Sequence, residues 1–218
     1  MSSSRSKLPT LLKLAMLLCA TAVPLTACTH PMNNEARPEY RENPSPRQAY
    51  RLTMTIKDAP GPLKIIASAA QYDVVNRECL PPPKDNPGGR SSPVPTRDIP
   101  FELAQVSDGV YVGTVYADAM IDEDYHGRGV CRWELIQARA HLKATGADGE
   151  TRFIAGLSQS EGEFQSGQPK TTYFWKGGYP ASKIEDFPDF GEPEVDRFKF
   201  DIRNELFTIA LASEEVAP

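Results

Sequence analysis

The chain has 218 residues, with 24 Lys and Arg against 29 Asp and Glu, and a formal net charge of −5 at pH 7. This length is enough for one domain with a substantial apolar core, or at most two small domains, and we expect one. The acidic balance excludes the basic surface that nucleic acids and anionic lipid headgroups require, and it favours a basic protein partner.

The first 27 residues have the order of features found in an export signal. Basic residues precede an apolar run that contains no acidic residue: Arg5, Lys7 and Lys13, then Leu14 to Val23. This order predicts a signal peptide over residues 1–27. The segment that follows, Leu25-Thr26-Ala27-Cys28, resembles the lipobox of bacterial lipoproteins, and this resemblance implies that Cys28 is acylated. The alternative is a secretory signal or membrane anchor with an incidental Cys28.

Cleavage before Cys28 would leave an acidic protein held to a membrane by its lipid. The 191 remaining residues contain 21 Lys and Arg and 29 Asp and Glu, a net charge of −8. By similarity to enterobacterial lipoproteins, Thr29 in place of Asp favours transfer to the outer membrane. We therefore expect the chain in the cell envelope, lipid-anchored on the periplasmic face.

The segment after the lipidation site has the composition of a linker. Residues 28–48 contain Pro31, Pro38, Pro44 and Pro46 among Asn, Arg and Glu, with few apolar side chains. Such a segment buries too little surface to fold by itself. The sequence therefore predicts a disordered tether over 28–48 and one folded domain over 49–218.

Two cysteines remain for the folded domain. Cys19 leaves with the signal and Cys28 carries the lipid, so Cys79 and Cys131 are left. An even pair in the oxidising periplasm predicts a disulfide bond. The alternatives are a metal pair or free thiols, although neither a CxxC motif nor a nearby histidine completes a set of metal ligands.

Short segments with a period of two dominate the domain. Alternation over residues 50–57 predicts a half-buried strand. Further strands are predicted over 63–75, from residue 101 onward, and over 110–116, 130–145, 151–157, 173–175 and 198–202, and the strand over 130–145 is expected to be bent or bulged. Residues 81–95 predict an exposed loop, and 204–212 fits either a strand or a short helix. We expect an all-β fold, an antiparallel β-sandwich with long loops. It is immunoglobulin-like in general architecture but not in Cys and Trp spacing, because Trp133 follows the second cysteine.

Polar side chains that could carry function are densest just before Cys131. They are Asp118, Asp122, Glu123, Asp124, Tyr125, His126 and Arg128. The alternating oxygens resemble the start of a calcium loop, but position twelve is Trp133 instead of glutamate, so we expect no metal site. One interpretation is an exposed acidic hairpin loop. The other is a surface for a protein partner, since Tyr, Trp and Arg are frequent at interface hot spots.

A second acidic and aromatic segment lies at 184–196. Its prolines predict a surface loop without regular structure, and its candidate partner-binding residues are Asp186, Phe187, Asp189 and Phe190. The phenylalanines either pack onto the sandwich or stand out from it, where acid and aromatic groups together would suit a basic cleft.

No set of residues predicts catalysis. Gly156-Leu157-Ser158-Gln159-Ser160 lacks the closing glycine of a hydrolase nucleophile elbow. His141 alternates along a predicted strand, and paired carboxylates are plentiful without any sign of a desolvated one. We expect no catalytic residues and no cofactor, and we do not expect an enzyme.

The segment Asp122-Glu123-Asp124-Tyr125-His126-Gly127-Arg128-Gly129-Val130-Cys131-Arg132-Trp133-Glu134-Leu135, downstream of a lipobox, resembles small proteobacterial lipoproteins that act as immunity proteins against secreted antibacterial effectors. The resemblance implies an inhibitor that binds a basic-surfaced periplasmic effector, such as a lipase or peptidoglycan hydrolase. The alternative is a structural or assembly lipoprotein of the outer-membrane envelope. An enzyme that acts on cell wall or lipid is a third hypothesis.

Overall fold

The alternating segment at 50–57 becomes the central strand of a five-stranded sheet. The computed structural model describes residues 38–86, 89–91 and 93–216. Leu52 and Met54 of β1 (Ala49–Lys57) are fully buried, whereas Arg51 and Lys57 are exposed. In this first sheet the strand order is β10 (Lys170–Trp175), β12 (Leu206–Glu215), β1, β7 (Val110–Tyr116) and β6 (Ala104–Ser107).

The second sheet is built around the long pair β2 (Lys64–Val74) and β8 (Trp133–Lys143). Its order is β11 (Pro188–Asp189), β9 (Arg152–Ser158), β8, β2 and β5 (Thr96–Pro100). Two register shifts interrupt the β2–β8 ladder. The shift that skips Ile136 agrees with the bulge predicted within 130–145, and the other skips Ile66 of β2. Neighbouring strands are antiparallel except for the short parallel pair β11 and β9.

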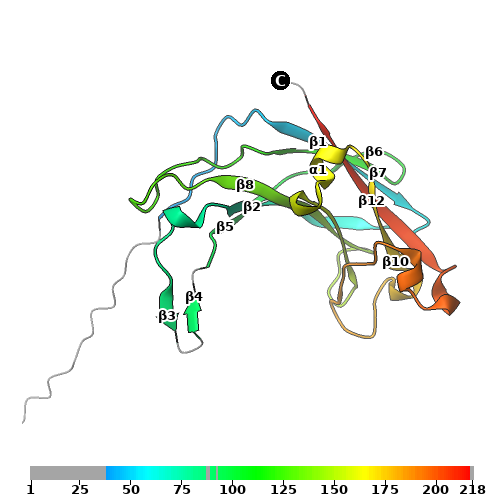
Figure 1. Ribbon diagram of the computed structural model, residues 1–218. Helices are drawn as coiled ribbons and strands as arrows, with labels where there is room; N and C mark the ends of the chain where they lie inside the picture. The colour runs from blue at the N-terminus through cyan, green and yellow to red at the C-terminus, as the bar shows by residue number, and fades with distance from the viewer. Residues whose placement is uncertain (1–37, 87–88, 92, 217–218) are drawn as a thin grey trace, which may run out of the picture. The chain divides into compact units, whose positions relative to one another are not determined.

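The core lies between the facing sides of the two sheets (Figure 1). Phe153 from the second sheet makes edge contacts with Phe174 and Phe207 from the first, at ring-centroid distances of 5.6 and 5.2 Å. Aromatic rings in this arrangement bury large apolar areas and join the sheets. The predicted antiparallel β-sandwich is therefore confirmed.

Short helical turns connect the strands. They are η1 (Arg77–Cys79), η2 (Gln159–Glu161), α1 (Glu163–Ser166), η3 (Lys176–Gly178), η4 (Val195–Arg197) and η5 (Phe200–Ile202). Phe164 of α1 is buried against Tyr50, with ring centroids 5.8 Å apart, and the Ser213 hydroxyl donates a hydrogen bond to the Phe164 carbonyl at 2.8 Å. The helix thereby covers one end of the sandwich core.

Several element predictions need correction. Residues 200–202, predicted as strand, form the turn η5, while the ambiguous segment near 204–212 forms β12. Inside or next to the predicted loop 81–95 lie β3 (Lys84–Asn86), β4 (Gly89–Ser91) and β5. Four of the five β5 residues are exposed, so that strand carries little hydrophobic alternation and is held by pairing with β2.

The predicted tether differs from the structure at its C-terminal half. Residues from Pro38 onward belong to the compact unit, and the Asn43 N–H donates to the Ala119 carbonyl at 2.8 Å. The Ile121 N–H likewise donates to the Arg41 carbonyl at 3.0 Å, so this segment adds an irregular strand-like edge. Its backbone bonds, which composition does not reveal, order a proline-rich stretch. The signal over 1–27, Cys28 and residues 29–37 lie outside the described residues.

Among the described residues, every helix is too short or too polar to cross a lipid bilayer. The predicted disulfide is confirmed: Cys79 and Cys131 are joined, with Cα atoms 5.2 Å apart and both side chains buried. The bond links η1, directly after β2, to the residue two positions before β8. It therefore closes the same end of the β2–β8 pair that the ladder already brings together.

Reduction of this bond should lower the free energy of unfolding by about 4 kcal/mol, because 52 residues of sequence separation are no longer constrained in the unfolded chain. Urea unfolding of the oxidised and reduced protein measures the difference. The same reductant should leave a Cys79→Ala/Cys131→Ala variant unchanged. Equal unfolding midpoints for the oxidised and reduced wild-type protein would contradict this expectation.

Candidate functional site

The connection between β7 and β8, residues 117–132, forms a disulfide-anchored loop, here called the Cys131 loop. Asn76 holds both sides of Cys131, because its Nδ2 donates to the Val130 carbonyl at 2.8 Å and its Oδ1 accepts the Arg132 N–H at 2.6 Å. The Cys131 N–H also donates to the Glu123 carbonyl at 2.9 Å. The base of the loop is thus fixed by one covalent bond and three hydrogen bonds.

The carboxylates predicted as partner contacts accept backbone hydrogen bonds. Asp118 accepts the N–H groups of Arg47 and Gln48 at 2.9 Å each, and Asp122 accepts the Trp133 N–H at 2.9 Å. These bonds join the loop to the start of β1 and to the start of β8. Asp118 and Asp122 therefore hold the loop in place. This role is structural and does not depend on a bound partner.

Asp124 organises the tip of the loop. Its Oδ1 accepts the N–H groups of Arg128 at 2.9 Å and His126 at 3.3 Å. These donors, the Arg128 N–H first, hold the pKa of Asp124 below its ordinary value. Gly127 and Gly129 have φ values of 67° and 101°, which let the chain turn back around the carboxylate.

An aromatic cluster supports the loop from the side of the N-terminal segment. Tyr40 packs edge-on against Tyr125 and Trp133, with ring centroids 5.0 and 5.1 Å away. The Tyr125 hydroxyl donates to the Ile121 carbonyl at 2.7 Å, and the Tyr40 hydroxyl lies 3.3 Å from Nε2 of His126. The sequence prediction missed Tyr40, which stands as a single aromatic residue in the supposed tether. Tyr125 and His126 are consequently only partly available to a partner.

One ion pair completes this contact. Nη2 of Arg41 lies 2.6 Å from Oε2 of Glu123, and the Arg41 Nε donates to the same oxygen at 3.0 Å. Both side chains are substantially exposed, so the pair adds orientation more than stability. Glu123, predicted as a partner contact, is therefore already neutralised by a residue of its own chain.

The Cys131 loop also exposes cationic and apolar groups. Arg128 and Arg132 are exposed, Val130 is 52 % exposed, and no carboxylate within the described part of the chain forms an ion pair with either arginine. These three residues line a shallow hollow of about 430 Å³ together with Asn76, Glu78, Cys79, Asp122 and Gly129. The loop thus presents two guanidinium groups and an apolar side chain beside the exposed carboxylates of Asp122 and Asp124.

The second predicted segment is bound to the opposite end of the second sheet. The Lys143 ammonium, almost buried, donates to Oδ1 of Asp186 at 2.7 Å, and the Gly149 N–H donates to the same atom. These contacts lower the pKa of Asp186, the Lys143 hydrogen bond most of all. The Phe187 carbonyl accepts the Arg152 N–H at 2.8 Å. Asp186 and Phe187 therefore attach the segment to β8 and β9.

The remaining two residues of that segment differ in exposure. Burial raises the pKa of Asp189 above its ordinary value, and its Oδ1 accepts the Gly191 N–H at 2.9 Å. Phe190, by contrast, is 66 % exposed. Of the two phenylalanines predicted as contacts at 184–196, Phe190 is therefore the one whose side chain stands out from the sandwich.

The structure does not bring the two predicted segments together. Trp133 begins β8 beside the Cys131 loop, and Lys143 ends β8 beside Asp186. Ten residue steps along a strand correspond to about 33 Å. Each segment must therefore be considered as a separate surface.

The weaker catalytic candidates have ordinary surroundings. Oγ of Ser158 lies 2.8 Å from Oγ of Ser160, and the Ser158 N–H donates to Oε2 of Glu163 at 2.5 Å. Burial, followed by the charges of Arg152 and Arg139, lowers the pKa of His141 on β8. Within the described residues, no three His, Cys, Asp or Glu side chains converge as metal ligands.

No protein-family model, no curated protein and no solved structure matches the chain. The interpretation of the Cys131 loop therefore rests on its geometry and on the sequence around it. The loop is a surface held in place by its own polar groups, and Arg128, Val130 and Arg132 are exposed on it.

Asp124→Ala should loosen the loop tip, because the His126 and Arg128 N–H groups lose their acceptor. Amide hydrogen exchange should show lower protection factors at both positions near pH 6. In the wild-type protein the depressed pKa makes this contribution complete above the unfolded value of about 3.9, and it is lost as the pH falls through the folded pKa. Asp108→Ala, in the exposed β6–β7 turn, should leave both amides unchanged, and unaltered protection in Asp124→Ala would contradict the assignment.

Asp186→Ala should lower the thermal unfolding midpoint, because it leaves the nearly buried Lys143 ammonium without its counter-ion. Lys143→Met in the same chain should restore most of the loss, since the methionine removes the charge and keeps the packing. The thermal midpoints of the two single variants and the double variant measure this coupling. Strictly additive midpoint shifts would show that the ion pair has no structural role.

Proposed function

We propose that the chain is a periplasm-facing lipoprotein that binds and inhibits a secreted antibacterial effector, and so acts as an immunity protein. The lipobox around Cys28 supports the location, and the resemblance of residues 122–135 to immunity lipoproteins supports the activity. The observation that carries the proposal is the rigidity of the Cys131 loop. A surface that is ordered before binding loses little conformational entropy when it binds, which favours a tight inhibitor.

The chemistry of the loop suits a protein partner. Arginine is over-represented among interface hot spots, and the exposed Arg128 and Arg132 flank the apolar Val130 above a hollow that a partner side chain can enter. The mature net charge of −8 would act at longer range and guide a basic effector toward the domain. Approach is thus favoured by the whole acidic surface, and the final contacts are made by a local cationic and apolar patch. The complex should be salt-sensitive.

One observation favours the second candidate, an assembly lipoprotein of the outer-membrane envelope. Three large aromatic side chains outside the Cys131 loop are exposed: Phe200 by 86 %, Phe190 by 66 % and Trp175 by 39 %. Exposed aromatic residues of this size are typical of protein contacts. In this alternative they would pack against an envelope complex, and the Cys131 loop would have no inhibitory role.

Cells that lack this chain should be killed by sibling cells that secrete the effector, and the wild-type chain should protect them. Arg128→Ala/Arg132→Ala should protect at least about tenfold less in a competition assay, which corresponds to a loss of about 1.4 kcal/mol of binding free energy. Arg51→Ala/Arg197→Ala removes two exposed arginines elsewhere and should protect fully.

Unharmed deletion cells would contradict the immunity function. Co-purification of the chain with envelope machinery, lost in Phe200→Ser but kept in the Arg128/Arg132 variant, would favour the assembly function instead.

A further inference from the structure

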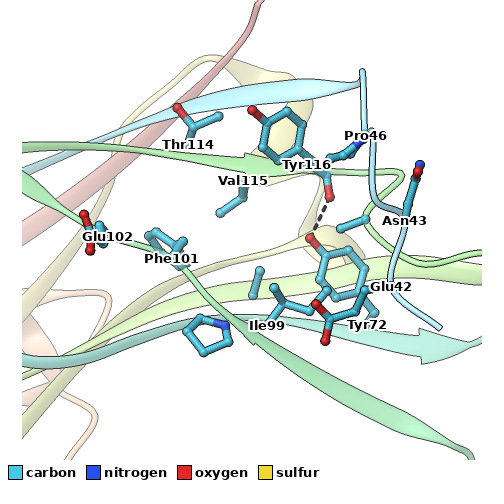
Figure 2. A pocket seen from close by; sticks show the side chains of 13 residues that line it. Glu42, Asn43, Pro46, Tyr72, Ile99, Phe101, Glu102, Thr114, Val115 and Tyr116 are labelled. Carbon is cyan, nitrogen blue, oxygen red and sulfur yellow. Dashed lines mark hydrogen bonds between the residues drawn. The ribbon is translucent and has the colours of Figure 1, made fainter. Parts of the chain in front are cut away.

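A second concave surface lies beside the N-terminal segment, between β5 of the second sheet and β7 of the first. Its volume is about 390 Å³. The floor is apolar, formed by Ala70, Ile99, Val115 and Ala119 together with the ring of Tyr72. Figure 2 shows Ile99 of β5 and Phe101 of the connection that follows it, with Glu42 and Glu102 at two sides of the cavity.

The edge of β7 beside this cavity has backbone groups without a strand partner. The Ile56 N–H donates to the Gly109 carbonyl and the Ala117 N–H donates to the Gln48 carbonyl, which fixes the phase of the β1–β7 ladder. Odd-numbered β7 residues therefore bond to β1, and even-numbered residues direct their N–H and C=O groups to the other side. There β6 pairs with β7 only over 110–112, so the edge is open at Thr114 and Tyr116.

The crossover from β5 to β6 creates this opening. A Cβ on Gly113 would collide with the carbonyl oxygen of Glu102, so the glycine lets residues 101–103 pass directly over β7. The chain leaves the second sheet at Pro100 and joins the first at Ala104. Beyond the crossing, no strand of the described chain pairs with the outer edge of Gly113–Tyr116.

Tyr72 forms the back of the cavity, and its hydroxyl lies near two carboxylates. Its hydroxyl donates to the Tyr116 carbonyl at 2.6 Å, which satisfies one of the outward groups of β7. Burial raises the pKa of Tyr72, and the negative charges of Asp118 and Glu42 raise it further. The carboxylates of Asp118 and Glu42 therefore lie close enough to the Tyr72 hydroxyl to act on it.

The rim adds a carboxylate without a counter-ion. Glu42 is paired with Arg97 at 2.8 Å, whereas Glu102 is exposed and forms no ion pair within the described part of the chain. An incoming strand along β7 would pass Glu102 while one of its side chains entered the apolar floor. Such a strand is complementary when apolar and basic residues alternate along it.

We propose that the Gly113–Tyr116 edge of β7 binds an extended segment of a partner protein in which apolar and basic residues alternate. The segment adds a strand to the first sheet through the outward N–H groups of Thr114 and Tyr116. An apolar side chain fills the cavity, and a neighbouring lysine or arginine pairs with Glu102. This site is distinct from the Cys131 loop and holds whether or not the partner is an effector.

The probe is a capped nine-residue peptide of alternating valine and lysine, added to the isotope-labelled mature protein. Amide hydrogen exchange at Thr114 should slow by about tenfold or more on saturation, as new strand hydrogen bonds form. Gly113 and Val115, already bonded to β1, should change little. A peptide with glutamate in place of lysine should bind at least several-fold more weakly. Unchanged exchange at Thr114, or equal binding of both peptides, would overturn the proposal.

Two variants locate the contact. Glu102→Lys should weaken binding of the lysine peptide about threefold to tenfold, while Asp108→Lys makes the same charge change in the exposed β6–β7 turn and should not. Thr114→Pro removes an N–H that β1 does not use and should abolish binding. If Thr114→Pro fails to fold, the comparison of Glu102→Lys with Asp108→Lys still tests the proposal. Equal weakening of peptide binding by these two variants would overturn the proposed site.

Hydrogen exchange at Thr114 in the protein without peptide tests two other occupants of the β7 edge. Thr114 protection that is already present at low concentration would assign the edge to another segment of this chain, and protection that grows with protein concentration would assign it to a second copy. Either result would overturn the proposal. A variant that no longer protects cells from their siblings, but still binds the peptide as the wild type does, tests the immunity function and not this site.

Discussion

The pairing of β2 with β8 is the constraint on which the rest of the structure depends. The ladder runs from Lys64 opposite Lys143 to Val74 opposite Trp133, so it determines both ends of the second sheet at once. At one end it brings Cys79 and Cys131 within bonding distance, and the disulfide then anchors the Cys131 loop. At the other end it places Lys143 where Asp186 can neutralise it. The two polar segments are separated because a single long strand pair connects them.

Several acidic residues of this protein accept hydrogen bonds from backbone N–H groups. Asp118, Asp122 and Asp124 each bind N–H groups in or beside the Cys131 loop, and Glu150 accepts three more in the turn after β8. Such bonds replace the ladder that an irregular segment lacks. The charge remains and contributes to the long-range field, while the bonded oxygens hold the loop in its conformation. The exposed groups of the Cys131 loop include Arg128, Val130 and Arg132 beside the carboxylates of Asp122 and Asp124.

The two sheets differ in how their open edges are protected. At the edge of β5, Pro100 has no N–H to offer and Asp98 carries a charge that Arg139 pairs with at 3.1 Å, features that discourage strand addition. The β7 edge at Thr114 has neither a proline nor a charged side chain of its own. It lies open because the chain must cross between the sheets over Gly113. A cavity and an unpaired strand edge consequently occur side by side.

The sequence by itself determined the strand-rich fold class and the positions of β1, β2, β7, β8 and β9, because alternation with a period of two is a local property of each segment. It also determined the cysteine pair, because only two cysteines lie in the predicted folded domain. It did not reveal β5 or the ordered segment from Pro38, whose residues are largely exposed and are held by backbone bonds to distant strands. The candidate site was predicted as a list of residues, but only the tertiary structure decided which were free. Asp118, Asp122 and Asp186 find partners 11 to 71 residues away, and such pairings are fixed by packing that no local pattern encodes.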